Sequence, residues 1–294
     1  MANLRDIKKR IVSVQSTRQI TRTMEMVSTA KIKRAQERIE LARPYTLAMM
    51  ELLGNVTRFA KGAQHPLLEA RHTKKRVVAI PVTSDRGLAG AFNSSILRIT
   101  DDYLRDMKAD GVEVDLITVG KKASGYFLYR GVEPRMSYRD ISDKPNFADA
   151  KAIANNVVRA YTEGEVDEVV IIFNRFVNVA EQSPELHRVL PIESAVLDEA
   201  AAEQSVVSAE YVFEPSADHV LNALLPTYIE ALIFRSLMES AAAEHGARRK
   251  AMKAATDNAS EMITTLTRVY NRARQAAITT EIAEIVGGAA ALED

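Results

Sequence analysis

The sequence has no cysteine among its 294 residues. Disulfide bonds, thiolate nucleophiles and cysteine-ligated metal sites are therefore excluded. Tryptophan is also absent, and aromatic residues make up only 6% of the chain. Such a composition is more typical of long helices with narrow aliphatic contact surfaces than of one large globular core. No run approaches the ~18 consecutive apolar residues of a membrane-spanning helix, so we do not expect the chain to cross a membrane.

Charge is balanced overall but strongly segregated. The chain has 39 basic and 39 acidic residues. Residues 1–43 contain eleven Lys and Arg against four acids, whereas residues 198–244 contain nine acids and the single base Arg235. Segregation of this kind indicates partner surfaces or a solvated face. A basic face suits nucleic acid, anionic lipid or an acidic protein, and charge alone does not choose among them.

The first sixty residues have the pattern of a long helix. The N-terminus lacks the apolar core of a secretory signal, and although it is basic and amphipathic like a transit peptide, its pattern continues to Leu41. Apolar residues recur at spacings of three and four in blocks separated by a polar run at 15–19, and the predicted contact positions are Ile7, Ile11, Val14, Ile20, Met24 and Val27. We expect Pro44 to kink or break the helix, and Gly54, Gly62 and Pro66 to end it.

The middle of the chain alternates between strand and helix patterns. Three short β-branched runs predict strands at 76–85, 112–120 and 166–174, and helical patterns lie between them at 94–107, 122–129 and 148–161. This alternation predicts a Rossmann-like parallel sheet covered by helices on both faces. A further strand, at an edge, is expected at 206–213.

The last eighty residues return to helix, with a regular heptad from Met252. The predicted seam steps by three and four through Met252, Ala255, Ala259, Met262, Leu266, Val269, Ala273 and Ala276. Helices of about 50 and 65 residues would span ~75 and ~100 Å, whereas a compact chain of this size has a radius of gyration of only ~19 Å. We therefore predict an α/β protein in which helices 1–60 and 216–288 form a long antiparallel coiled coil, with an α/β domain at 74–213 inserted between them.

The sequence contains few motifs of catalytic or cofactor-binding sites. The chain lacks the Gly-rich phosphate loop, the dinucleotide fingerprint and the nucleophile elbow, and its five histidines show no metal-ligand spacing. We expect no catalytic, cofactor or metal site. The loop 84–93, SDRGLAGAFN, follows the first strand, where α/β folds bind ligands. It is open to two interpretations: an anion site built from Arg86 and a helix N-terminus, or a turn shaped by Asp85 and the glycines.

Two features near the C-terminus indicate a partner. Amide and guanidinium groups sit among alanines at Asn258, Asn271, Arg272, Arg274 and Gln275, where either specific contacts or a solvated face would account for them. Beyond them, residues 278–292 form a mostly apolar end. Such an end is either sheathed by another protein or a frayed alanine-rich tail.

Three stretches carry a resemblance to a known family: residues 11–32, the loop 84–93, and the pair 244–260 and 271–290 (NRARQAAITTEIAEIVGGAA). Over essentially its full length the chain resembles the gamma subunits of bacterial F-type ATP synthases. The resemblance implies a single-copy central-stalk rotor that couples ion flow through a c-subunit ring to ATP synthesis or hydrolysis in an alpha/beta head. The resemblance implies the alpha and beta subunits, the epsilon subunit and the c ring as partners. It implies neither a nucleic-acid partner nor a cofactor.

The resemblance also assigns roles by position. Met24, Arg86, Arg274 and Gln275 match residues that contact the head, and Tyr211 and Glu214 match the foot that meets the c ring. Ala89 stands where many relatives have cysteine, and the regulatory dithiol of the chloroplast type is absent, so thiol control is not expected. A bacterial peripheral protein on the cytoplasmic face of the cell membrane is implied.

Two other classes compete with the rotor. A static coiled-coil scaffold or nucleic-acid binder would use the basic helix and bind duplex in a salt-dependent way. A small-molecule enzyme would use the α/β domain with Arg86, and its ligand would stabilise that domain.

Overall fold

The computed structural model describes residues 4–59, 65–71, 73–192, 214 and 216–293. Two helices lie at the ends of the chain, α1 (Leu4–Phe59) and α6 (Ala217–Glu293). The chain divides into two compact units, and each unit contains part of both helices. Unit 1 combines Met1–Ser28 with Arg249–Asp294, and unit 2 is Thr29–Arg248. The predicted domain limits near residues 60 and 213 fall in or beside stretches outside the described residues, so those ranges stay a prediction.

Helix α1 continues through the predicted breakpoints. Pro44 lies inside the helix, and so does Gly54. A break at Pro44 and an end at Gly54 are therefore wrong, whereas a kink at Pro44 stays a prediction. The physical reason is packing, because Met49, Leu53 and Val56, on both sides of Gly54, are buried in the core of unit 2. Burial of such side chains outweighs the helix-breaking tendency of a single proline or glycine.

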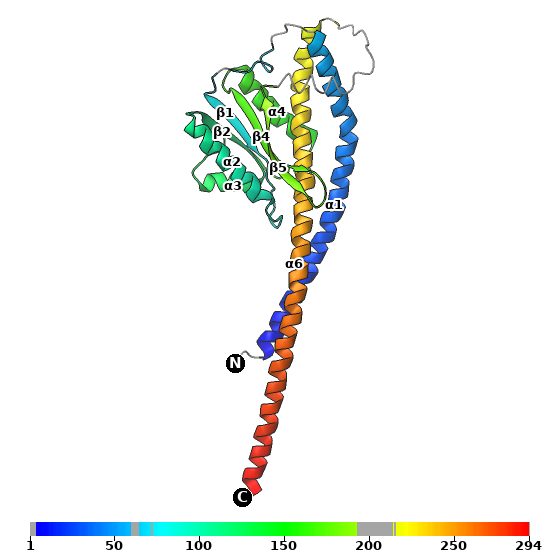
Figure 1. Ribbon diagram of the computed structural model, residues 1–294, viewed down its shortest axis with the longest axis vertical. Coiled ribbons are helices and arrows are strands. Elements are labelled where there is room, and N and C mark those ends of the chain that lie inside the picture. Colours follow the sequence, from blue (N-terminus) through cyan, green and yellow to red (C-terminus); the bar gives the residue numbers. More distant parts are fainter. Residues whose placement is uncertain (1–3, 60–64, 72, 193–213, 215, 294) are drawn as a thin grey trace. The chain divides into compact units, whose positions relative to one another are not determined.

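Unit 2 contains a five-stranded sheet with the order β3-β2-β1-β4-β5 (Figure 1). Four strands are parallel: β1 (Arg76–Pro81), β2 (Glu113–Val119), β3 (Met136–Tyr138) and β4 (Glu168–Phe176). The edge strand β5 (Gln182–Leu190) pairs antiparallel with β4. The crossover helices are α2 (Phe92–Ala109), α3 (Lys121–Tyr129) and α4 (Phe147–Thr162).

The three predicted strands and three predicted crossover helices are confirmed, and so is the α/β fold with long terminal helices. Strands β3 and β5 were not predicted. β3 has only three residues, and β5 carries polar residues along most of its length, so neither shows an apolar run. The expected strand at 206–213 lies outside the described residues.

The sheet is covered on both faces. Alternate residues of β1 and β4 point to opposite sides, so Ile80 and Ile171 join one cluster while Ala79 and Val170 join the other. The first cluster includes α4 and the unit 2 portions of α1 and α6. The second is formed with α2 and α3. This arrangement sets the C-terminal ends of the parallel strands beside α6.

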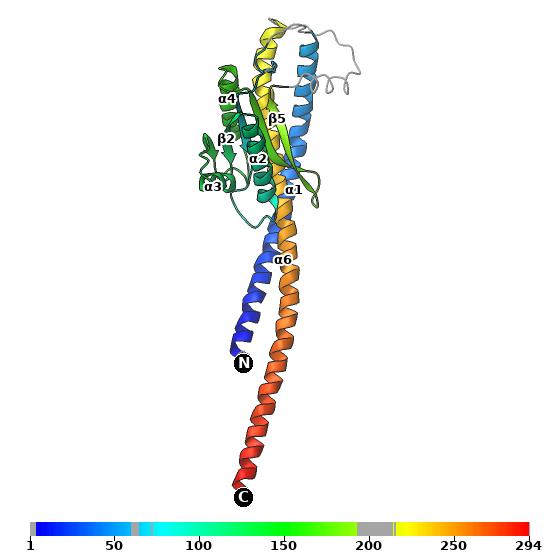
Figure 2. The ribbon, with the colours of Figure 1, turned by 60° about the vertical axis from the view of Figure 1, so that its left-hand side comes forward.

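Unit 1 is a pair of helices that lie side by side, and α6 continues beyond the start of α1 (Figure 2). The register is antiparallel and is marked by a hydrogen bond between the Oγ1 atoms of Thr21 and Thr256, 2.8 Å apart. Buried and partly buried positions of α1 in this unit recur with a heptad period at Ile7, Ile11, Val14, Thr21, Glu25 and Ser28. Those of α6 follow the same period at Met252, Thr256, Ala259, Ile263, Leu266, Tyr270, Ala273 and Ala277.

The observed seam differs from the predicted one at five of the fourteen predicted positions. Ile20, Val27, Met262 and Val269 are 47–60% exposed, and Ala276 is also exposed. The seam instead passes one residue further along, through small polar residues in α1. Thr21 and Ser28 fit there because their hydroxyls are satisfied, the first by Thr256 and the second by the carbonyl oxygen of Met24 at 2.7 Å. Small side chains also let the helices approach closely. The polar run at 15–19 therefore does not divide the seam, because the heptad stays in phase from Val14 to Thr21.

Among the described residues, α6 has one stretch, Asp218–Val286, with a window long and apolar enough to cross a membrane, at a mean hydropathy of 1.3. Half of that window is buried inside the protein. Packing against the sheet accounts for its apolar character, as in the core helix of many proteins that do not cross a membrane.

The corrected seam predicts different costs for two methionines of α6. Met252 is 5% exposed and Met262 is 52% exposed. We expect Met252→Ala to destabilise the helix pair by about 2–3 kcal/mol because it leaves a cavity, and Met262→Ala to change it by less than about 0.5 kcal/mol. Hydrogen exchange at residues 4–28 of the full chain measures both effects. Equal costs for the two variants would contradict the observed seam.

Candidate functional site

In a doubly wound sheet, ligands bind at the carboxyl ends of the strands where the strand order reverses direction. In this sheet that point lies between β1 and β4, because β2 and β3 follow on one side and β4 and β5 on the other. The loop 84–93 follows β1 directly and the side chain of Asn174 projects from β4. The amide of Asn174 donates to the carbonyl oxygen of Phe92 at 3.1 Å, which ties the loop to β4.

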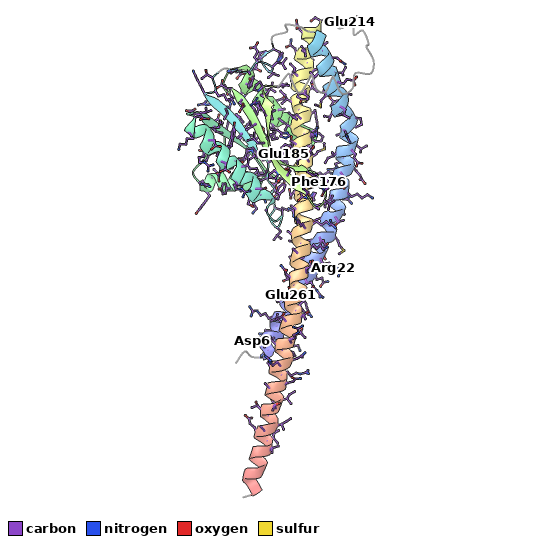
Figure 3. The ribbon with its side chains drawn as sticks, in the orientation of Figure 1. Asp6, Arg22, Phe176, Glu185, Glu214 and Glu261 are labelled. Carbon is purple, nitrogen blue, oxygen red and sulfur yellow. The ribbon has the colours of Figure 1, made fainter. Side chains whose placement is uncertain are left out.

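The chain's own helix α6 packs at this point. Ala243 of α6 is buried against Ala89 and Phe92 of the loop, and Phe176 packs on the same cluster. Phe176 lies at the end of β4, on the hairpin that also carries Glu185 (Figure 3). Gly246 faces β5, where a Cβ would lie 2.9 Å from the side-chain nitrogen Nε2 of Gln182. The position at which a related fold would accept a ligand is therefore filled by a helix of this protein.

The loop is held by its own polar groups. The Asp85 carboxylate accepts from the backbone N–H groups of Lys121 at 3.0 Å and Ser142 at 3.1 Å. Burial by itself raises the pKa of Asp85, but hydrogen bonds from backbone N–H groups outweigh it and hold the pKa below its usual value. Asn93 accepts from the backbone N–H of Ser84 at 2.9 Å. These bonds support the interpretation of Asp85 and the glycines as a structural turn, with the Arg86 side chain exposed.

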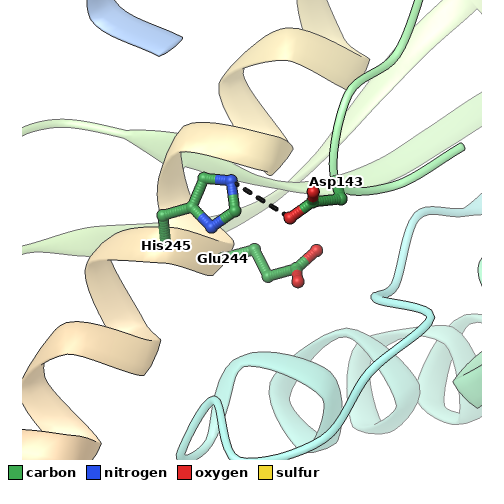
Figure 4. Close-up of side chains that lie close together, drawn as sticks. All are labelled: Asp143, Glu244 and His245. Carbon is green, nitrogen blue, oxygen red and sulfur yellow. Dashed lines mark ion pairs between the residues drawn. The ribbon is translucent and has the colours of Figure 1, made fainter. Parts of the chain in front are cut away.

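An ion-pair cluster joins this region to both helices. Asp143 pairs with Lys31 of α1 at 2.7 Å, and Glu244 of α6 pairs with Arg248 at 2.6 Å. His245 lies between the two pairs, its Nε2 3.5 Å from Asp143 and its Nδ1 3.5 Å from Arg248 (Figure 4). Arg248 also donates to the carbonyl oxygen of Gly87 at 3.3 Å. The network therefore links α1, α6 and the loop within unit 2.

The cluster fixes the protonation of His245. Burial lowers the pKa of His245 to about 4, although the nearby Asp143 opposes the shift. With Arg248 donating toward Nδ1, the network favours the neutral tautomer that carries its proton on Nε2, facing Asp143. Burial raises the pKa of Glu244, with Arg248 opposing it. Burial raises the pKa of Asp143, but the hydrogen bond and charge of Lys31 lower it. The net effect is a pKa below the usual value of an aspartate.

The same three side chains have the composition of a metal site. Asp143, Glu244 and His245 offer ligand atoms within 4.8 Å of one another. Both carboxylates, however, already face a cation of the protein, and a divalent ion would have to displace Lys31 and Arg248. The donor set is therefore compensated internally, and its chemistry is that of a structural ion-pair network.

The structure distributes the predicted contact residues over both units rather than gathering them in one site. Met24 is partly buried in unit 1, where Arg274 and Gln275 are exposed. In unit 2, Arg86 and Glu214 are exposed. Tyr211 lies outside the described residues.

Sequence reasoning missed Lys31, Asp143 and Asn174. The Glu244–Arg248 pair has a signal, because opposite charges four residues apart share a helix face. Asp143 has none, since its partner Lys31 is 112 residues away and no local pattern indicates that pairing.

Comparison with known proteins gives a consistent result along the whole chain. A family described as ATP synthase matches residues 3–292. An ATP synthase gamma chain from Desulforamulus reducens is 46% identical over 293 residues and covers 100% of both chains. One from Xanthomonas campestris pv. campestris is 43% identical over 294 residues and covers 99% of this chain and 100% of the relative.

Solved structures show the same similarity. A chain from the central stalk and c ring of the Tetrahymena thermophila mitochondrial ATP synthase is 26% identical, with a TM-score of 0.60, over 80% of this chain and 99% of that one. A chain from the Euglena gracilis mitochondrial ATP synthase has a TM-score of 0.67 over 98% of this chain and 94% of that one. At 20% identity, the second similarity shows the fold alone.

The buried neutral His245 predicts a loss of stability in acid. Its pKa in the folded state, about 4, lies below the usual 6.5, so between these values the unfolded chain binds more protons. Stability from this group is therefore present above pH 6.5 and falls as the pH drops toward 4. We expect His245→Gln to cost about 1 kcal/mol at pH 7.5, and this cost to shrink or reverse at pH 4.5.

Urea unfolding of the full chain at a series of pH values measures this difference. Glu244, whose raised pKa acts in the opposite direction, is present in both proteins, and Asp143, Lys31 and Arg248 are also retained. His219→Gln is the matched control because His219 is exposed on α6. A cost for His245→Gln that stays constant from pH 7.5 to 4.5 would show that this histidine is not held neutral by burial.

Proposed function

Because this chain belongs to the ATP synthase gamma-chain family, we propose that it is the central-stalk rotor subunit of a bacterial F-type ATP synthase. It couples ion flow through a membrane c ring to ATP synthesis or hydrolysis in a head of alpha and beta subunits. The observation that carries this proposal is the match from residue 3 to residue 292, together with 46% identity to a curated gamma chain over full length. Epsilon is the further partner at the stalk, and the complex holds one copy of the chain.

The surface of unit 1 supports a sheathed rotor. Large apolar side chains are exposed on both helices, among them Ile20, Val27, Met262 and Val269 at 47–60%. The C-terminal part of α6, beyond the reach of α1, exposes Ile278, Ile282 and Ile285 at 47–71%. A monomeric surface rarely shows so much apolar area without a partner. An enclosing ring of subunits would cover it while leaving the rod free to turn.

We assign the polar contacts by family position. Arg274 and Gln275 engage the head as polar catches, and Met24 lies near the lower head contacts. Arg86 pairs with acidic groups of a beta subunit, and Tyr211 with Glu214 meets the c ring. Exposed ion pairs are worth only about 0–1 kcal/mol each, so such contacts guide rotation without locking it.

The subunit has no catalytic site of its own in this proposal. The switch point of the sheet, where an α/β enzyme would bind substrate, accommodates Ala243 and Arg248 of α6. Nucleotide chemistry then belongs to the head, and this chain acts by imposing its asymmetry on successive catalytic sites. The complex is associated with a membrane, and we place the chain on its cytoplasmic face.

The proposal predicts which proteins accompany the chain. A tagged copy, purified in mild detergent from membranes of its own organism, is expected to bring the alpha, beta and epsilon subunits and the c ring. In that complex, Arg274→Ala with Gln275→Ala is expected to lower ATP-driven ion pumping several-fold while the complex stays assembled. Arg268→Ala is the matched control, an exposed arginine of the same helix outside the assigned catches.

Recovery of the chain without alpha and beta subunits would overturn the rotor assignment. Salt-dependent binding of the purified chain to duplex DNA would favour a nucleic-acid-binding scaffold instead. Pumping equal to that of the parent in the double variant would remove Arg274 and Gln275 from the contact set and leave the rotor assignment standing.

A further inference from the structure

Unit 2 contains an apolar pocket of about 630 Å³ whose walls come from α1 and α6, with the start of α4 beside them. Each wall contributes a small residue, Ala42 from α1 and Ala231 from α6, and such side chains do not fill the space. Three larger apolar side chains of the lining stay partly exposed, Tyr45 at 53%, Phe147 at 40% and Leu47 at 39%. A cavity within the ~300–1,000 Å³ range, lined in this way, has the size and the surface of a small-molecule site.

The charged side chains of the lining are mostly basic. They are Arg43 of α1 and Arg235 of α6, against the single carboxylate of Glu239, so two positive charges and one negative charge leave a net charge of +1. The side chain of Glu239 is only 9% exposed, and it accepts a hydrogen bond from Nε of Arg235 at 2.8 Å. Because this pair compensates itself, the lining offers no free acid to a cation, and the positive charge that remains is that of Arg43.

Unused hydrogen-bond donors lie on both walls of the pocket. Arg43 has no ion-pair or hydrogen-bond partner among the described residues. Arg235 engages Glu239 through Nε, and within the described part of the chain its two Nη groups donate no hydrogen bond. A guanidinium presents its N–H groups as a planar fork that matches the two oxygens of a carboxylate, and such bonds are about twice as strong as neutral ones. The lining is therefore complementary to an anion.

We infer that this pocket binds a small amphiphilic carboxylate, with an alkyl body among the apolar side chains and its carboxylate at the guanidinium of Arg43. One negative charge neutralises the lining, whereas an amine would add a third cation beside the two arginines. A ligand held there contacts α1 and α6 together, so its binding stabilises the folded pairing of these helices in unit 2. The site goes beyond the proposed rotor function and does not rest on it.

The test is a calorimetric titration of the full chain with three probes that share one alkyl chain length. These are octanoate, octan-1-ol and octylamine. We expect octanoate to bind most tightly, octan-1-ol about tenfold more weakly because it makes no charge-assisted bond, and octylamine least. Saturating octanoate is also expected to slow hydrogen exchange at residues 39–47 and 231–239 and to leave α2 unchanged.

Three variants locate the carboxylate and the alkyl chain. Arg43→Gln is expected to weaken octanoate about tenfold and to leave octan-1-ol nearly unchanged. Arg22→Gln is the matched control, because Arg22 is an exposed arginine of α1 that is not among the residues lining the pocket, and it is expected to bind octanoate like the parent chain. Ala42→Trp keeps both arginines but fills the pocket from α1, and it is expected to abolish binding of octanoate and octan-1-ol.

Octylamine that binds as tightly as octanoate would overturn the proposal. So would octanoate binding that is unchanged in Arg43→Gln or that survives in Ala42→Trp. Absence of octanoate binding at millimolar concentration to the folded parent chain would also overturn it, and the exposed apolar lining would then be a surface for another protein. Circular dichroism of each variant confirms that the helices are intact before its binding is compared.

Discussion

The pairing of the two chain ends is the constraint on which the rest of the structure depends. Thr21 and Thr256 are 235 residues apart in sequence, yet their hydroxyls share a hydrogen bond in the seam of unit 1. Closing a loop costs entropy that grows only slowly with its length, and the α/β fold between the ends orders most of the intervening residues. The unit 2 portions of α1 and α6 pack on its sheet.

That constraint explains why the α/β fold does not look like an enzyme. Its strand order and crossovers create a switch point, but α6 must pass beside it to reach its partner helix. Ala243 is small and buried against the loop, Arg248 donates to the carbonyl oxygen of Gly87, and Asp143 pairs with Lys31 of α1. A fold suited to ligand binding is thereby converted into an anchor for a helix pair. In the proposed rotor role, the chain acts through the surfaces that it presents to its partners.

The sequence predicted the strands, the crossover helices and the heptad period because each depends on local apolar spacing. It did not predict which heptad positions of α6 face α1. Either residue 255 or residue 256 could face α1, and so could either 262 or 263. Only the register of α1 against α6 decides which residue of each pair lies in the seam. Ile20 and Val27 misled the prediction since apolar residues were assigned to the seam, whereas Thr21 and Ser28 occupy it. Pairings across long separations, such as Lys31 with Asp143, leave no trace in a single sequence.

A cross-link across the seam tests the pairing of the chain ends most directly. The chain has no cysteine, so Thr21→Cys with Thr256→Cys introduces the only thiols. Because the two hydroxyl oxygens are 2.8 Å apart, mild oxidation is expected to join these cysteines rapidly and almost completely, as mass spectrometry of the monomer will show. The exposed pair Ile20→Cys with Met262→Cys is expected to stay reduced. Failure of the first pair to join, or equal joining of both, would contradict the register on which this account rests.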